Sequence, residues 1–404
     1  MLSKAKLFSA WVALLFAAGS VLGQAQGAAK KKLQIFILAG QSNMVGHANY
    51  VTLPAMLTSK EPGVNQLAKW VFKEGAIAPG DARTLLQVRI RRDQLSNDLR
   101  AKKLGDPAKI AAAQAELKKL QADFEIKSKK IKDAFTVSRR VYITSVGDGH
   151  RRSGPLTIGF GGSADKIGPE LGFGLALEKR IDAPILLIKT SWGGKSLHYN
   201  FRPPSAGPYE LSKQEQTKGD VKKIKENAGL NYRMMNKIVH DVLRDLKKYH
   251  PEYDAGIGYE IAGFVWFQGF NDQFSPAFRD NYKNNMIAFI KDVRKEYQVP
   301  DLPFVIGVMG TGATKESVDK NAVSVAQRQA AARPEFKGNV AAVESYRYYD
   351  LDALAIFRKG WAEHLLEFSL VGSDRPYHYM GSGTFFVRLG DAFATAMVDL
   401  RKKQ

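Results

Sequence analysis

The stretch that decides the fold is LQIFILAGQSNMVGH, residues 33–47. Its apolar run over residues 35–39 is typical of a strand buried on both faces of a parallel sheet. The run stops at Gly40, and the small polar residues that follow predict a turn into a helix at the carboxyl end of the strand, where open α/β sheets bind ligands. Because no G-x-S-x-G elbow is present, Ser42 is either a nucleophile or only the cap of that helix.

The same pattern of a buried strand followed by a helix recurs along the chain. Further strands are expected at residues 141–144, 184–189, 261–267, 303–308 and 340–343. Helices are expected at residues 169–179, 230–249, 278–297, 318–332 and 383–399. Strands that alternate with helices predict an α/β fold, a three-layer α/β/α sandwich with a parallel sheet.

The amino terminus has the pattern of a secretory signal peptide over residues 1–25. Two lysines precede an apolar run, and small residues follow it. An uncleaved anchor is the alternative. No later segment is apolar for long enough to cross a bilayer. We therefore expect an exported protein, periplasmic or extracellular, whose residues 26–404 form the catalytic domain.

Composition narrows the classes of function. The chain has 404 residues, is 45% hydrophobic and contains no cysteine, so it can bury a large core but forms no disulfide and no thiolate metal site. Its formal net charge of +20 would suggest nucleic acid for a cytoplasmic protein, but no nucleic-acid motif is present. For an exported chain the charge indicates a bias toward anionic surroundings, with acidic polysaccharide, an anionic envelope or no specific partner as the alternatives.

Residues 81–135 differ in composition from the rest of the chain. Two runs of apolar residues at helical spacing are separated by a Gly-Asp-Pro turn at residues 105–107. This pattern predicts a helical hairpin inserted into the domain. Its basic outer face is either a solvated surface or an anchor to anionic polysaccharide or another protein.

Four segments present polar groups at predicted loops near strand ends. They are Ser42, Gly193 with Gly194, Gln268 with Asn271 and Asp272, and Asp374 with His378. Acyl transfer needs a nucleophile, a base, an acid that orients the base, and donors for an oxyanion. The chain offers each of these, with the nucleophile first and the base last. No spacing typical of a metal site is present.

Together these motifs resemble the SGNH-type carbohydrate acetylesterases. The sequence is most similar to the sialate O-acetylesterase-like and acetylxylan-esterase group, carbohydrate esterase family 6. The resemblance covers most of the mature chain except the hairpin. The segments that carry it are residues 40–44 (GQSNM), 168–170 (GPE), 192–194 (WGG) and 266–269 (WFQG), with a late Asp and His.

The resemblance implies roles for individual residues. Ser42 would be the nucleophile, His378 the general base and Asp374 the acid that orients it, although the family spaces its acid three residues before the histidine and Asp374 lies four before. The oxyanion donors would be the amide of Ser42, an amide in the Gly193-Gly194 loop, and Gln268.

Other residues are weaker candidates. Contacts with substrate are expected, less firmly, for Gln41, Asn43, Trp192, Asn271 and Asp272, with core packing as the alternative for the tryptophan and loop structure as the alternative for the last two. His47 either borders the pocket or packs. His150 and His198 are expected in loops.

The sequence therefore predicts an exported serine esterase that removes O-acetyl groups from carbohydrate through an acetyl-enzyme, with no cofactor and no metal. The alternative is a non-catalytic carbohydrate-binding or scaffold protein on the same fold.

Overall fold

The computed structural model describes residues 30–403, so the predicted signal peptide at residues 1–25 lies outside the described residues. Everything below concerns the compact unit that begins at Lys32. No helix in this part of the chain is both long and apolar enough to cross a membrane.

A seven-stranded sheet forms the centre of the fold, in the order β4-β3-β6-β1-β7-β8-β9. Its strands are β1 (Leu33–Gly40), β3 (Val141–Gly147), β4 (His150–Pro155), β6 (Ile185–Ser191), β7 (Tyr259–Phe267), β8 (Phe304–Val308) and β9 (Val340–Glu344). All neighbouring pairs are parallel except β3 with β4. The parallel sandwich predicted from sequence is confirmed, but His150 begins the antiparallel edge strand and does not lie in a loop.

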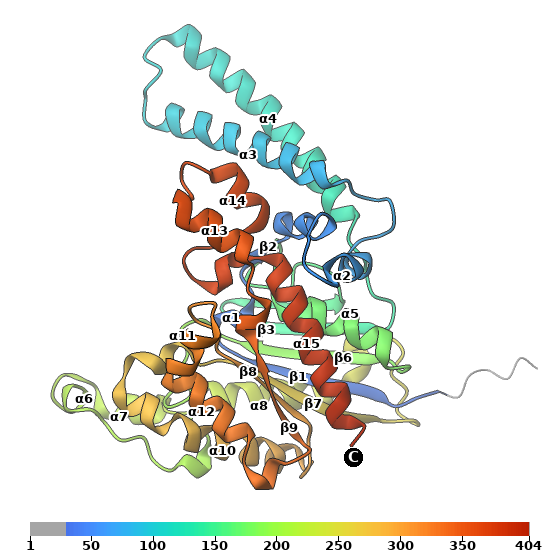
Figure 1. The fold of residues 1–404 in the computed structure, drawn as a ribbon, viewed down its shortest axis with the longest axis vertical. Helices are drawn as coiled ribbons and strands as arrows, with labels where there is room; N and C mark the ends of the chain where they lie inside the picture. The colour runs from blue at the N-terminus through green and yellow to red at the C-terminus, as the bar shows by residue number, and fades with distance from the viewer. Residues whose placement is uncertain (1–29, 404) are drawn as a thin grey trace, which may run out of the picture. The chain divides into compact units, whose positions relative to one another are not determined.

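Helices cover both faces of the sheet (Figure 1). The helices are α1 (Ser42–Val45), α2 (Val64–Val71), α3 (Pro79–Arg100), α4 (Pro107–Asp133), α5 (Pro169–Arg180), α6 (Lys213–Lys218), α7 (Val221–Asn227), α8 (Leu230–Leu243), α9 (Leu246–Tyr249), α10 (Pro276–Tyr297), α11 (Lys315–Lys320), α12 (Ala322–Ala331), α13 (Leu351–Gly360), α14 (Leu365–Val371) and α15 (Gly383–Arg401). Two expected helices are each broken in two: 230–249 into α8 and α9, and 318–332 into α11 and α12.

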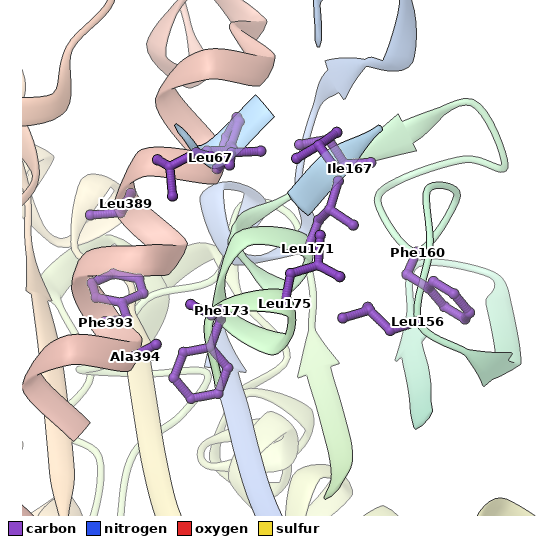
Figure 2. Close-up of a cluster of buried hydrophobic side chains, with 14 of the residues drawn as sticks. Leu67, Leu156, Phe160, Ile167, Leu171, Phe173, Leu175, Leu389, Phe393 and Ala394 are labelled. Atoms are coloured by element: carbon purple, nitrogen blue, oxygen red, sulfur yellow. The ribbon is translucent and has the colours of Figure 1, made fainter. Parts of the chain in front are cut away.

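Alternate residues of the central strands enter two separate cores. Phe36 and Leu38 of β1 pack with residues of α5 and α15 on one face, a cluster that Figure 2 shows around Phe173 and Phe393. Ile35 and Ile37 point to the other face, where α8, α10 and α12 pack. A strand flanked by two cores must be apolar throughout, which explains the continuous run at residues 35–39.

Helices α3 and α4 occupy the segment predicted as a hairpin and lie side by side (Figure 1). Leu85 and Leu86 of α3 and Ile131 of α4 join the same core as α5 and α15. The base of the hairpin is therefore part of the folded body, and α3 also packs against α14.

Candidate active site

Three loops meet at the carboxyl edge of the sheet because their strands end in register. Gly40 of β1 pairs with Ser191 of β6 on one side and with Phe267 of β7 on the other. A Cβ atom at Gly40 would lie 2.1 Å from the Phe267 carbonyl oxygen, so only glycine permits this approach. The loops that follow these three residues therefore start next to one another.

Ser42 is the first residue of α1 and does not cap it. The N-cap position is Gln41, and no side chain caps the helix. The Ser42 hydroxyl forms no hydrogen bond with His378 or with any other residue in the range 30–403, and such catalytic hydrogen bonds commonly tighten only when substrate binds. Its backbone amide has no partner within the helix, as for any first helical residue. Both groups are therefore available for chemistry.

Gln41 is buried and links the first loop to the third. Its Nε2 donates to Asn271 Oδ1 at 2.9 Å, and its Oε1 accepts from the amides of Gly269 and Asn271 at 3.2 and 3.3 Å. This position favours a structural role over the predicted contact with substrate. The adjacent Asn43 is half-buried, and its Oδ1 has no hydrogen-bond partner among the described residues.

Gln268, expected as an oxyanion donor, is engaged inside the protein. Its Nε2 donates to Asp272 Oδ2 at 2.5 Å and to the Lys195 carbonyl at 2.9 Å. Asn271 instead presents an amide: Gln41 holds its Oδ1, and its Nδ2 has no acceptor within residues 30–403. The structure thus places Asn271, and not Gln268, as the side chain with a free donor beside the Ser42 turn.

Asp272 is fully buried and ties two loops together. Its carboxylate accepts from the amides of Leu197 and His198, both at 2.9 Å, and from Gln268. Burial raises the pKa of Asp272 to about 6, although these hydrogen bonds oppose the shift. This position favours the alternative in which Asp272 holds the loop structure over the predicted contact with substrate.

In the second loop, only one of the two glycine amides predicted as oxyanion donors is not already hydrogen-bonded. The Gly193 amide donates to Asp148 Oδ2 at 2.7 Å, whereas the Gly194 amide has no acceptor in the described part of the chain. Gly194 has a φ of +65°, in the left-handed region that favours glycine. Trp192 is buried and its ring packs on Phe201 with centroids 5.9 Å apart, so core packing describes it better than a sugar-stacking wall.

Asp374 and His378 form a pair despite their unusual spacing. His378 Nδ1 lies 2.9 Å from Asp374 Oδ2. Burial raises the pKa of Asp374, but the hydrogen bond with His378 and the charge of that ring outweigh it, and the pKa falls below its ordinary value. His378 and the two residues after it have φ values of +52°, +52° and +60°, so a tight turn in the left-handed region follows the pair.

Ser373 attaches this turn to the segment that follows Ser42. Its hydroxyl accepts from the amide of Asn49 at 2.9 Å and donates to the Gly381 carbonyl at 2.9 Å. The loop of the predicted base is thereby anchored seven residues downstream of the predicted nucleophile.

His47, for which packing and a place at the pocket were both open, stacks on His378 with ring centroids 4.1 Å apart. The Lys166 ammonium lies 3.3 Å from His47 Nδ1. Burial, the charge of His378 and that of Lys166 lower the pKa of His47 to about 4, so it is neutral at pH 7. His47, Asp374 and His378 also bring three possible metal ligands within 4.8 Å of one another, but the ammonium beside His47 disfavours a cation there.

A fully buried ion pair contacts the end of the short helix that begins at Ser42. Lys189 of β6 donates to Glu170 Oε2 at 2.7 Å and to the carbonyls of Val45 and Phe160, both at 2.8 Å. Val45 is the last residue of α1, so the pair fixes the short helix that begins at Ser42. Burial lowers the pKa of Lys189, and the carboxylate of Glu170 opposes this shift.

Exposed aromatic side chains lie beside His378, and the sequence analysis missed them. Phe274 is 68% exposed and Tyr377 is 55% exposed. Phe270 connects them, with ring centroids 5.1 Å from Phe274 and 6.2 Å from Tyr377. The position of Tyr377 directly before His378, and of Phe270 directly before Asn271, was the available signal.

The carboxyl edge of this α/β sandwich thus carries the Ser42 turn, and Ser373 anchors the hydrogen-bonded pair of Asp374 and His378 to the segment that follows it. The family model described as "Carbohydrate esterase, sialic acid-specific acetylesterase" matches residues 149–352. The chain therefore belongs to this family and is a carbohydrate O-acetylesterase. The matched segment contains neither Ser42 nor the pair Asp374 and His378.

Three solved structures resemble the chain distantly. An Arabidopsis thaliana protein has 16% identity and a TM-score of 0.44, with 91% of this chain and 98% of that one covered. A carbohydrate acetylesterase from Xanthomonas citri has 11% identity and a TM-score of 0.44, with 92% and 57% covered. NanS has 13% identity and a TM-score of 0.35, with 78% of each chain covered. Comparison with curated protein sequences gives no significant match.

Proposed function

We propose that this carbohydrate esterase is an exported serine enzyme that works through an acetyl-enzyme, with Ser42 as nucleophile, His378 as base and Asp374 as its orienting acid. The observation that carries this proposal is the contact of 2.9 Å between His378 Nδ1 and Asp374 Oδ2. It holds the proton on Nδ1 and leaves Nε2 to accept the proton of a serine. The contact also supports the triad despite the unusual spacing, which had kept a non-catalytic scaffold open as the alternative.

The reaction runs in two halves. His378 takes the Ser42 proton while Ser42 Oγ bonds to the acetyl carbonyl carbon, and the carbonyl becomes an oxyanion. When that intermediate collapses, the C–O bond to the sugar breaks and His378 returns the proton to the sugar oxygen. Water then gives a proton to His378 and attacks the acetyl carbon, and the second collapse releases acetate and restores the Ser42 hydroxyl.

The oxyanion needs donors that are not already engaged. The Ser42 amide, the Gly194 amide and Asn271 Nδ2 meet this condition, whereas Gln268 and the Gly193 amide donate within the protein. We therefore assign Asn271 the role that the family resemblance gives to Gln268. Gln268 and Asp272 hold the loop that carries Asn271.

The test is hydrolysis of 4-nitrophenyl acetate, and acetate release from acetylated polysaccharide, by the mature chain and its variants. We expect Ser42→Ala and His378→Ala each to lower kcat by about 10⁴-fold or more. His364→Ala, which removes an exposed histidine from the start of α14, is the matched control. Mass spectrometry of the quenched wild-type reaction should show an acetyl group on Ser42. Full activity of Ser42→Ala would refute the mechanism.

A separate experiment tests the predicted export. Expression of the full chain followed by cell fractionation and amino-terminal sequencing should give a periplasmic or secreted product cleaved near residue 25. An intact amino terminus in the membrane fraction would instead support an uncleaved anchor.

A further inference from the structure

A cavity of about 510 Å³ lies between the hairpin and the loop of the predicted base. Helix α3 lines one side of it and α14 lines another. Ser373 and Arg375, which flank Asp374 in the chain, both line the cavity, and so does Lys166. It therefore adjoins the predicted catalytic acid without including it.

The charge of this cavity is positive. Lys166 and Arg375 line it, and neither forms an ion pair with any carboxylate among residues 30–403. Arg89 of α3 has only a long contact of 3.7 Å with Asp93. That carboxylate also accepts from Arg92 at 2.8 Å, so the single acid of the lining is already neutralised. The cavity thus holds two cations, Lys166 and Arg375, that pair with no carboxylate among residues 30–403, and a third, Arg89, that shares Asp93 with Arg92.

Its remaining surface combines amide groups with apolar side chains. The amide side chains come from Asn49, Gln94 and Asn97, and the apolar ones include Leu86 and Phe368. A sugar ring presents hydroxyl groups at its edge and C–H groups on its faces, and a lining of this mixed kind suits both.

Nearly the whole lining lies outside the segment that the family model matches. Lys166 falls within residues 149–352, and the other lining residues belong to segments 49–97 and 365–375. The cavity is therefore a feature of this chain's hairpin and α14, not of the part that places it in the family.

We propose that this cavity binds an anionic sugar unit, carrying a carboxylate or a sulfate, of the glycan whose acetyl group is removed. Lys166, Arg375 and Arg89 pair with the anion. The unit bound there neighbours the one that presents its ester to Ser42. This assignment rests on the proposed function, because only the predicted roles of Asp374 and His378 make the cavity a substrate subsite.

The test is equilibrium binding to the Ser42→Ala protein, which keeps turnover out of the measurement. Titration calorimetry compares three acetylated oligosaccharides of equal length: one with uronic acid units, one sulfated and one neutral. We expect at least one anionic ligand to bind about tenfold or more tightly than the neutral one. The two anionic arms distinguish the carboxylate from the sulfate.

Variants then locate the binding. Arg89→Glu and Lys166→Gln should each weaken anionic binding about tenfold and leave neutral binding within about twofold. Arg83→Glu is the matched control, because Arg83 is an exposed arginine on α3 outside the cavity. This control measures how much of the affinity for anionic ligands comes from the overall net charge of +20.

Two outcomes overturn the proposal. One is equal binding of the anionic and neutral ligands. The other is an Arg83→Glu effect as large as that of Arg89→Glu, which would assign the affinity to overall charge. Either result leaves the esterase intact, because the wild-type hydrolysis assay is separate. Conversely, an inactive wild type that still binds anionic ligand through Arg89 would refute the proposed function alone.

Discussion

The imidazole rings of His47 and His378 stack with an angle of 16° between their planes. The first ring follows the proposed nucleophile by five residues, and the second is the proposed base. A cation at His47 would repel the imidazolium that the proposed mechanism forms on His378. The low pKa of His47 removes that repulsion, so the ring supports its neighbour as a neutral flat surface.

The same pKa predicts a pH-dependent stability. The pKa of His47 is about 4 in the folded chain and ordinary in the unfolded one, so the unfolded state binds the proton more readily. Unfolding free energy should therefore fall as pH drops from about 6.5 to 4. With a discount for partial exposure, His47→Gln should remove about 1–2 kcal/mol of that fall. Urea unfolding at pH 7 and pH 4 measures it, and identical pH profiles for both proteins would contradict it.

Asp374→Asn should inactivate the enzyme without unfolding it. The amide would hold His378 in the wrong tautomer, and kcat on 4-nitrophenyl acetate should drop by about 10³- to 10⁴-fold. Glu367→Gln, an exposed acid of α14, is the control and should stay near wild type. A loss of less than about tenfold for Asp374→Asn would mean that His378 works without this acid.

Lys189→Met should destabilise the fold severely. It leaves Glu170 charged and buried with the Gly168 amide as donor but without its cationic partner, which costs about 3–5 kcal/mol. Replacing both residues, Lys189→Met with Glu170→Met, should cost less than the sum of the two single changes. Denaturant unfolding gives all three values, and simple additivity would show that the pair is not coupled.

Asn271→Ala should mainly lower activity, whereas Gln268→Ala should mainly lower stability. Loss of a free oxyanion donor predicts that Asn271→Ala lowers kcat by about 10²- to 10³-fold. Because Gln41 Nε2 also loses its acceptor, unfolding free energy should fall by about 1 kcal/mol. Loss of an internal clamp predicts that Gln268→Ala lowers unfolding free energy by about 1–3 kcal/mol. Kinetics and thermal unfolding of both variants decide the matter. A stable but inactive Gln268→Ala beside a fully active Asn271→Ala would restore the assignment made from the family resemblance.

The aromatic surface beside His378 should affect binding more than chemistry. Tyr377→Ala and Phe274→Ala should raise KM for acetylated polysaccharide about 3- to 10-fold, since each removes an exposed ring that can stack on sugar. Tyr259→Ala is the comparison, because Tyr259 is a partly exposed ring at the opposite end of β7. Equal KM values for the three variants would argue against a sugar-binding surface here.

The sequence predicts the sheet because its strands are buried on both faces and leave unbroken apolar runs. It also predicts Ser42, Asp374 and His378 as candidates, since each follows a recognisable local pattern. The sequence does not reveal which polar groups are already hydrogen-bonded within the protein. Gln41 and Asn271 bond across 230 positions of chain, and no local pattern records such a contact.

The antiparallel strand β4 escaped prediction for a different reason. Its sequence from His150 to Pro155 is polar and partly exposed, as an edge strand can be, and it carries no apolar run. The stacking of His47 on His378 likewise depends on how a distant turn is anchored by Ser373, which no spacing between the two histidines could indicate.

The hairpin leaves and rejoins the body of the protein at adjoining points. The amide of Lys73 donates to the Ala134 carbonyl, and that of Thr136 donates to the Val71 carbonyl, both at 2.9 Å. A segment with neighbouring ends can be exchanged between related enzymes without altering the sheet or the serine turn. We therefore expect that a different hairpin can replace this one, provided that it carries apolar side chains in place of Leu85, Leu86 and Ile131 in the core.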